Sequence, residues 1–432
     1  MSYSEFLSKA LDAAGAREGA RIEASSGGKT YSGILMPHHE FSSPDILIIK
    51  IGSGYNIGVR MRPGLEVRVL DGQHEAQKKE DAAPRIDGLP NISLIGTGGT
   101  IASYVDYRTG AVRPALSASE LTNAVPEIRD IANVSARALF SIFSENMGVE
   151  HWQKLAEAVA EEMNNGAAAV IIPHGTDTMG YTAAALSFML EGLSGPVVLV
   201  GAQRSSDRPS SDASSNLLAA VRFCTAGGNA GVFAVMHDSP GDDSFAVHTG
   251  TRVRKMHTSR RDAFRSINAP PVARIGADGR IEQPQIPEAP PAGKVVVRSA
   301  MEKNAVLLQY YPGMSPDLFE DIIMKSKGIV ISGSGLGHVN ENMVPLIKKA
   351  CGNGSVVVIT SQCLNGSTNL NVYNTGRDML SAGAISVGDM LPETAYVKLM
   401  WALANTADAE EAKKLMKTPL RSETGDRRTV DV

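Results

Sequence analysis

Two short loops, each directly after an apolar run, constrain the fold of this chain more than any other feature. The first loop is Gly96-Thr97-Gly98-Gly99-Thr100, after the run Ile92-Ser93-Leu94-Ile95. The second loop is His174-Gly175-Thr176-Asp177-Thr178, after the run Ala169-Val170-Ile171-Ile172. Short runs rich in β-branched residues are typical of buried strands in a parallel sheet. Because open α/β sheets bind ligands at the carboxyl ends of their strands, both loops are expected at a ligand-binding edge.

The residues of these loops indicate a chemistry. Glycine allows a sharp turn and brings backbone N–H groups close to a ligand. Two loops that both present threonine hydroxyls, one with an adjacent aspartate, favour a hydrolytic site with a hydroxyl nucleophile. The alternative for either loop alone is a helix N-cap, in which the hydroxyl accepts a backbone N–H. A dinucleotide fingerprint fails at Ile101, where its third glycine should stand, and neither loop ends in the Gly-Lys-Ser/Thr of a phosphate-binding loop.

Length and composition restrict the class of protein. A chain of 432 residues, 43% hydrophobic and 20% charged, is expected to be a soluble protein of two or three domains. Its net charge of −4 argues against a stand-alone nucleic-acid binder. Three cysteines with no CxxC pair fit a reducing compartment and give no zinc-cluster pattern. With neither a signal-peptide pattern nor a long apolar run, we expect a cytoplasmic protein without a membrane span.

The distribution of strand-like, helical and proline-rich segments along the sequence predicts three parts. Residues 1–85 hold short strand-like segments between glycine turns and are expected to form a small β-barrel module plus a linker. Residues 86–290 and 291–432 alternate strands with helices, which predicts two α/β domains with parallel sheets, the first carrying both loops. The stretch Pro270–Gly293 has six prolines and no periodic run, so a second linker is expected there.

A threonine can attack an amide only if its hydroxyl loses a proton as it does so. Lys255, in the basic segment Arg252–Thr258, is a candidate to accept that proton. Pattern alone does not favour Lys255 over Arg252, Arg254 or Arg260, and a blindly chosen lysine most often lies on the surface.

An ordered set of motifs from Leu89 onward resembles the bacterial-type L-asparaginases. The set comprises both loops, Gly201-Ala202-Gln203-Arg204 with Asp212 and Asn216, and Lys255 nine residues before Phe264-Arg265-Ser266. The resemblance implies that Thr100 is the nucleophile and that Thr176, Asp177 and Lys255 form a second cluster. It also implies three substrate-binding residues: Tyr107 on a flap, Ser144 for the α-carboxylate, and Glu145 beside it.

The front module, which asparaginases lack, points to a more specialised branch. Through four segments, the first of them in the front module itself, the chain resembles the family of the D subunit of archaeal glutamyl-tRNA(Gln) amidotransferase. These segments are Asn56-Ile57-Gly58, Ser144-Glu145-Asn146-Met147, Thr360-Ser361-Gln362-Cys363 and Asp389–Lys398.

This second resemblance implies that the chain releases ammonia from asparagine or glutamine and passes it to a partner, the E subunit of the same amidotransferase. Two D and two E subunits are expected to assemble. The partner would convert Glu-tRNA(Gln) to Gln-tRNA(Gln) with ATP and Mg, while this chain binds no cofactor.

Two alternatives remain open. One is a free-standing cytoplasmic L-asparaginase with an appended stabilising module. The other is a nucleotide- or amino-acid-binding regulator that has lost catalysis. The joint presence of Thr100, Thr176, Asp177 and Lys255 argues against the regulator.

Overall fold

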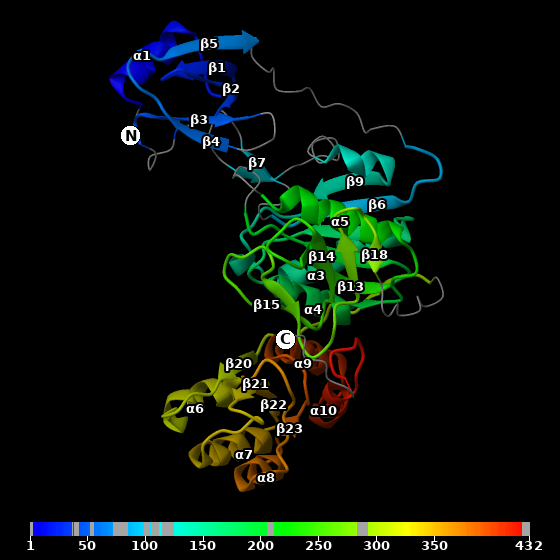
Figure 1. Ribbon diagram of the computed structural model, residues 1–432. Helices are drawn as coiled ribbons and strands as arrows, with labels where there is room; N and C mark the ends of the chain where they lie inside the picture. Colours follow the sequence, from blue (N-terminus) through cyan, green and yellow to red (C-terminus); the bar gives the residue numbers. More distant parts are fainter. Residues whose placement is uncertain are drawn as a thin grey trace.

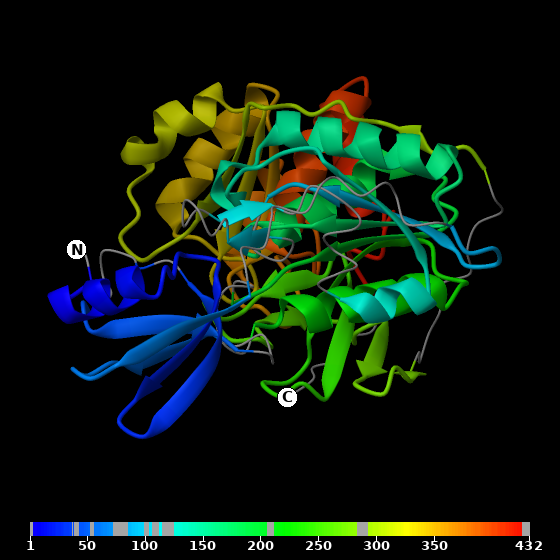
Figure 2. The same cartoon turned by 90° about the horizontal axis from the view of Figure 1, so that it is seen from above.

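The chain forms three successive units, a small β-domain and two α/β domains (Figure 1). The computed structural model describes residues 3–36, 38, 43–51, 56–71, 85–98, 103–105, 112–114, 125–204, 211–282 and 293–425. The β-domain projects from the body formed by the two α/β domains (Figures 1 and 2). The expected α/β class with a small N-terminal β-domain is confirmed.

The small β-domain is a five-stranded antiparallel sheet closed on one side by a helix. Its elements are α1 (Glu5–Ala13), β1 (Arg21–Ser26), β2 (Lys29–Leu35), β3 (Ile46–Lys50), β4 (Asn56–Arg60) and β5 (Glu66–Asp71). The strand order is β4-β3-β2-β1-β5, and no pairing between β4 and β5 closes the sheet within the described residues. Leu7 and Leu11, one helical turn apart on α1, pack with Ile22, Leu47 and Ile49 of the sheet.

The first α/β domain is built on an eight-stranded sheet. Five parallel strands lie in the order β9 (Asn133–Ala138), β6 (Asn91–Gly96), β10 (Ala169–Pro173), β12 (Pro196–Val200) and β13 (Gly231–His237). An antiparallel edge follows, made of β14 (Ser244–Thr249), β17 (Ala273–Gly276) and β18 (Ile281–Glu282). Helices α3 (Val149–Asn164) and α4 (Met179–Met189) cover one face, and α5 (Ala213–Thr225) covers the other.

Burial on both faces explains the uninterrupted apolar runs of this sheet. On β10, Val170 and Ile172 pack toward α3 and α4, whereas Ala169 and Ile171 pack toward α5. Because successive side chains of a strand point to opposite faces, a strand covered on both sides has no solvent-facing position for a polar residue.

The expected linker at Pro270–Gly293 is wrong for its first half. Strands β17 and β18 lie in this stretch and extend the main sheet beyond β14. Ala273 and Ile275 are buried while Arg274 between them is exposed, which is strand alternation over four residues. A run this short gives little periodic signal, and its pairing with β14 is a tertiary contact.

The second α/β domain has a four-stranded parallel sheet. Its strands are β20 (Ala305–Gln309), β21 (Gly328–Gly333), β22 (Val356–Ser361) and β23 (Ile385–Ser386), hydrogen-bonded in that order. Helices α6 (Pro316–Lys325), α7 (Val344–Gly352) and α8 (Asn374–Ser381) cover one face, and α9 (Pro392–Asn405) and α10 (Ala409–Lys417) cover the other. Helix α9 also packs on α4 of the first domain, where Phe188 stacks on Trp401 with ring centroids 5.9 Å apart.

Shorter elements connect these layers. They are β7 (Ser103–Val105) with β8 (Val112–Pro114), β11 (Leu190–Glu191) with β19 (Val296–Val297), β15 (Val253–Lys255) with β16 (Phe264–Ser266), and the 3₁₀ turns η1 (Pro126–Asp130), η2 (Ser144–Asn146) and η3 (Glu341–Met343). Among the described residues, no helix has the length and apolar character that crossing a membrane requires.

Candidate active site

The two glycine–threonine loops begin at the ends of neighbouring strands. Strands β6 and β10 pair in parallel, so their carboxyl ends lie side by side. The backbone N–H and the hydroxyl of Thr97 both donate to the carbonyl of Pro173, at 3.2 and 2.9 Å. Gly98 follows with a φ of +105°, and a side chain there would collide with the backbone of Ile142. The described start of the first loop therefore lies beside the end of β10, where the second loop begins, as expected from the sequence.

Lys255 joins Thr176 and Asp177 in one cluster. Its Nζ lies 2.8 Å from the Thr176 Oγ1 and 2.7 Å from the Asp177 Oδ1. The Lys255 side chain is 14% exposed, whereas that of Asp177 is 70% exposed. The amine is thus largely shielded from water where it contacts Thr176. On its solvent-exposed side it forms an ion pair with the Asp177 carboxylate. In both contacts the Lys255 amine is the donor and the Thr176 or Asp177 oxygen is the acceptor, so one hydrogen-bonded unit joins the amine, the hydroxyl and the carboxylate.

Strand pairing places Lys255 beside Thr176 and Asp177. Residues Val253–Lys255 form β15, which pairs antiparallel with β16 so that Lys255 faces Phe264 across the ladder. The N–H of Met256 continues the pairing to the carbonyl of Ala263 at 2.6 Å. The lysine therefore sits at the end of a fixed hairpin and not on a free loop.

Of the four remaining predicted site residues, Ser144 lies against the second loop. It is 5% exposed, and its carbonyl accepts a hydrogen bond from the Thr178 hydroxyl at 2.7 Å. Glu145, the next residue of η2, is exposed. Thr100 and Tyr107 lie outside the described residues, so their roles stay predictions.

Gly175 leaves no space for a side chain between the second loop and Ser144. A Cβ at this position would lie 2.7 Å from the Ser144 Cβ and 2.9 Å from its hydroxyl. We expect Gly175→Ala to displace Ser144 and to cost about 1–3 kcal/mol of stability by overpacking. If Ser144 binds substrate, KM should rise by roughly tenfold, which corresponds to about 1.4 kcal/mol of binding free energy. Gly352→Ala, where nothing lies within 4 Å, is the control. Equal KM values for the two variants would remove Ser144 from substrate binding.

His174 supports the second loop from inside the protein. It is 1% exposed, and its Nδ1 lies 2.6 Å from the carbonyl oxygen of Gly175. Burial lowers the pKa of His174 to about 4, although the hydrogen bond to Gly175 acts in the opposite direction. The ring is therefore neutral near pH 7, with Nδ1 as the hydrogen-bond donor, and it braces the backbone beside Thr176.

Buried neutral histidines make the stability of the chain pH-dependent. Burial also lowers the pKa of His248 to about 4. Unfolding returns each ring to a pKa of about 6.5, so the unfolded chain binds more protons as the pH falls. We expect the free energy of unfolding to drop by about 1.4 kcal/mol per pH unit for each of these rings between pH 6.5 and 4.

Urea unfolding of wild type and His248→Asn at several pH values measures this effect. In His248→Asn, the fall in the free energy of unfolding between pH 6.5 and 4 should be smaller by about 1.4 kcal/mol per pH unit. The same slope in both proteins would mean that His248 is not held neutral by the fold.

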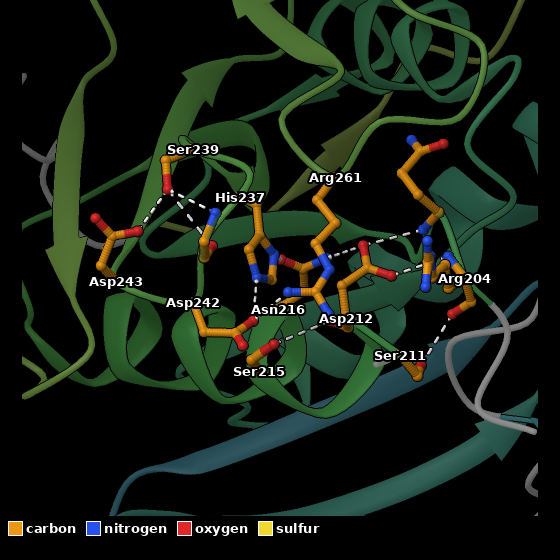
Figure 3. A network of polar contacts seen from close by, with 12 residues as sticks. Arg204, Ser211, Asp212, Ser215, Asn216, His237, Ser239, Asp242, Asp243 and Arg261 are labelled. Carbon is orange, nitrogen blue, oxygen red and sulfur yellow. Dashed lines mark hydrogen bonds and ion pairs between the residues drawn. The ribbon is translucent and has the colours of Figure 1, made fainter. Parts of the chain in front are cut away.

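A polar network fixes the turn after β12 (Figure 3). The Asp212 carboxylate accepts the backbone N–H groups of Gln203 and Arg204, at 3.0 and 2.9 Å. The Asn216 amide, one turn along α5, donates to the carbonyl of Gly201 and to Asp212. Asp212 and Asn216 are fully buried, so these bonds are protected from competition by water.

The network continues to residues that no sequence motif singled out. His237 lies 2.6 Å from the Asn216 side-chain oxygen through Nδ1 and 3.2 Å from Asp242 through Nε2 (Figure 3). Arg261 also pairs with Asp242. His237 closes β13 and Asp242 follows in the next loop, so their contact depends on tertiary folding and not on a motif.

The network reaches the Thr176–Lys255 cluster through Gly201. A Cβ on Gly201 would lie 2.7 Å from both the Thr176 Cγ2 and the Met179 Cε. The backbone that Asn216 holds is thus in direct contact with the methyl group of Thr176. By fixing the Gly201 backbone, the network limits the positions open to the Thr176 side chain and so helps to orient its hydroxyl toward Lys255.

No group of three or more His, Cys, Asp or Glu side chains in the described parts of the chain could hold a metal ion. The chemistry of the cluster is that of hydroxyl, amine and carboxylate groups.

Three family profiles match consecutive parts of the chain. The GatD N-terminal domain matches residues 16–70, the N-terminal asparaginase domain residues 91–287, and the C-terminal domain of glutaminases and asparaginases residues 304–416. Thr176, Asp177 and Lys255 all lie within the second of these matches.

Solved structures of asparaginases share the fold of the body. The thermostable L-asparaginase of Thermococcus kodakarensis superposes with a TM-score of 0.71 at 33% identity, covering 78% of this chain and 100% of that protein. L-asparaginase I of Vibrio cholerae gives 0.69 at 29% identity, covering 78% and 99%.

Similarity to curated proteins extends into the N-terminal β-domain. The D subunit of glutamyl-tRNA(Gln) amidotransferase from Pyrococcus furiosus is 52% identical over 393 residues, covering 90% of this chain and 89% of that protein. The same subunit from Thermofilum pendens is 41% identical over 444 aligned positions, covering 99% and 98%. The chain therefore belongs to the family of the glutamyl-tRNA(Gln) amidotransferase D subunit.

Proposed function

We propose that this chain hydrolyses the side-chain amide of asparagine or glutamine and supplies the ammonia to a partner subunit. The observation that carries the hydrolytic part is the placement of Lys255 Nζ within 2.8 Å of Thr176 and 2.7 Å of Asp177. Lys255, which follows Thr176 by 79 positions and Asp177 by 78, meets both of these neighbouring residues in one cluster. Hydroxyl activation by an adjacent amine is one established route to a nucleophilic site.

In the proposed reaction, the hydroxyl oxygen of Thr100 attacks the amide carbon. A C–O bond forms, the hydroxyl proton passes to the Thr176–Lys255 pair, and the C–N bond then breaks. The departing nitrogen takes a proton from the same pair and leaves as ammonia. Water hydrolyses the resulting ester with the lysine again accepting a proton, which yields aspartate or glutamate and regenerates the threonine.

Asp177 and Ser144 have supporting parts in this proposal. The Asp177 carboxylate compensates the charge on Lys255 when the amine holds the transferred proton. Ser144, buried under the second loop, is assigned to the α-carboxylate of the substrate, with Glu145 beside it and Tyr107 closing over it. This assignment follows the asparaginase resemblance and the contact of Ser144 with Gly175 and Thr178.

Membership of the D-subunit family supports a proposal for the destination of the ammonia. We assign this chain to a cytoplasmic complex of two D and two E subunits, in which the E subunits use ATP and Mg to convert Glu-tRNA(Gln) to Gln-tRNA(Gln). This chain itself binds no cofactor in the proposal. Ammonia reacts only as the neutral species, so a route that excludes water between the two kinds of subunit is part of the proposal.

Ammonia release measured with and without the partner tests this function. The chain alone should release ammonia weakly, and the partner with ATP and Glu-tRNA(Gln) should raise the rate. A competing amine-trapping enzyme should intercept only part of the ammonia. Complete interception would contradict a protected route, and no ammonia from either amide under any of these conditions would overturn the proposed function.

A free-standing L-asparaginase is the second candidate, favoured by the 0.71 TM-score to an L-asparaginase that is covered in full. Under that alternative the isolated chain would turn over asparagine rapidly and the partner would leave its rate unchanged. The GatD N-terminal domain match at residues 16–70 favours the amidotransferase subunit.

A further inference from the structure

The strand that carries Lys255 is anchored from the second α/β domain. Arg252, directly before β15, is 3% exposed, and its NH1 group donates to the Asp389 Oδ2 at 2.8 Å. Its Nε donates to the carbonyl of Ser422 at 2.7 Å. Arg254, inside the strand, pairs with Glu393 at 2.9 Å. Two of the three residues that precede Lys255 are thus held by side chains or backbone of the other domain.

The segment 418–425, which we call the C-terminal strap, closes this contact. The Arg421 carbonyl accepts the Thr251 hydroxyl at 2.8 Å, and the Arg421 guanidinium donates to the Ser187 carbonyl at 2.7 Å. The N–H of Gly425 donates to Asp389, the same carboxylate that holds Arg252. The strap therefore touches α4, the residue before Arg252, and Asp389 at once.

A buried ion pair holds the strap itself. Lys398 of α9 pairs with Glu423 at 2.5 Å, and both side chains are fully buried. Glu423 also accepts the backbone N–H groups of Leu420 and Arg421. The junction between β15, the strap and α9 therefore contains two ion pairs, Lys398–Glu423 and Arg252–Asp389. All four of their side chains are no more than 3% exposed. Buried ion pairs add little net stability over apolar substitutes, so stability alone does not explain two of them here.

Backbone strain concentrates at the same junction. Within the described ranges, the non-glycine residues with left-handed φ are Asn268, at 60°, and Ser422, at 59°. Asn268 donates to the Asp389 carbonyl and accepts the N–H of Gly366. The Ser422 carbonyl is the acceptor for Arg252. Strained residues of this kind persist where surrounding contacts over-determine them, which is most often at functional sites.

We propose that Asp389 and the C-terminal strap form a clamp on Arg252 that positions Lys255 for proton transfer with Thr176. The proposal rests on the proposed function, because the position of Lys255 affects the rate only if Lys255 takes part in hydrolysis. Arg252, Asp389 and Glu423 are positioning residues: they contact neither Thr176 nor Asp177. A misplacement of about 1 Å at a catalytic group can cost roughly 100-fold in rate.

Steady-state kinetics of ammonia release by Asp389→Asn and Arg252→Lys, well below the melting temperature of each variant, tests the clamp. Both variants should lose about 10- to 100-fold in kcat with KM within about twofold of wild type. Arg252→Lys, which keeps the charge, should lose less than Arg252→Met. Ser355→Ala removes a buried hydrogen bond of 2.7 Å to Ser326 in the same domain, away from β15, and should leave kcat unchanged.

Two further variants keep the outcome decisive. If Asp389→Asn does not fold, Thr251→Val removes the 2.8 Å hydrogen bond between the strap and the residue before Arg252 without leaving a buried charge unpaired, and a loss of kcat in the same direction is expected. Lys255→Met is the reference. If Lys255→Met is inactive while the clamp variants keep the wild-type kcat, the clamp is overturned and the proposed function stands. If Lys255→Met is fully active, the proposed function fails, and the clamp fails with it.

Discussion

Lys255→Met is expected to lower kcat for ammonia release by about 10³-fold, within the 10²- to 10⁴-fold range of general acid–base catalysis. The variant removes the amine that donates to the Thr176 hydroxyl oxygen at 2.8 Å and with it the group that the proposed reaction uses to accept a proton. The pH–rate profile should change as well, because a group that takes part in proton transfer is gone. Initial rates with asparagine and glutamine over a range of pH measure both effects.

Lys413→Met is a matched control for this variant. Lys413 lies on α10, its side chain is 18% exposed, and it pairs with an exposed carboxylate, that of Glu410, at 2.8 Å. Burial, pairing distance and partner exposure thus resemble those of Lys255 and Asp177, at 14%, 2.7 Å and 70%. The control should keep the wild-type rate. Similar rates for both variants, with an unchanged pH–rate profile, would remove Lys255 from the mechanism.

Glu423→Ala is expected to destabilise the protein by about 3–5 kcal/mol, because it leaves the Lys398 ammonium buried without its partner. The double variant Lys398→Met with Glu423→Gln should be far less destabilised, since no unpaired charge remains. Urea unfolding of wild type and both variants measures the difference. Equal losses in the single and double variants would show that the unpaired charge of Lys398 is not the source of the destabilisation.

The same pair predicts how stability depends on acid. Burial alone would raise the pKa of Glu423, but the Lys398 ammonium and the backbone N–H groups of Leu420 and Arg421 together hold it below its usual value. A carboxyl with a lowered pKa stabilises the fold above the unfolded value of about 4.3 and loses that contribution as the pH falls below it. The double variant should therefore show a weaker acid dependence of its unfolding free energy below about pH 4.3.

The sequence predicted the parts of the site that local pattern determines. Both loops follow apolar runs that are indeed β6 and β10, and the general rule for parallel sheets places their ends together. Local pattern did not select Lys255, because its segment holds several basic residues and because Thr176, which it contacts, lies 79 positions away in the sequence. Only the resemblance to asparaginases selected it. The structure brings it to Thr176 and Asp177.

Other features depend on contacts that no local pattern records. The bond between Arg252 and Asp389 joins residues 137 positions apart, and nothing in the sequence around either residue pairs it with the other. His237 likewise meets Asn216 only through the packing of β13 on α5. The linker prediction fails at β17 and β18 because edge strands of two to four residues carry almost no periodicity.

Covalent trapping of the nucleophile tests the central claim most directly. A diazoketone analogue of asparagine or glutamine alkylates a nucleophile that attacks at the amide position, and peptide mapping by mass spectrometry locates the adduct. We expect loss of ammonia release together with an adduct on Thr100, in the loop that begins beside Pro173, and a much slower reaction in Lys255→Met. An adduct on a residue outside both loops, such as the exposed thiol of Cys363, with the same loss of activity would contradict a threonine nucleophile.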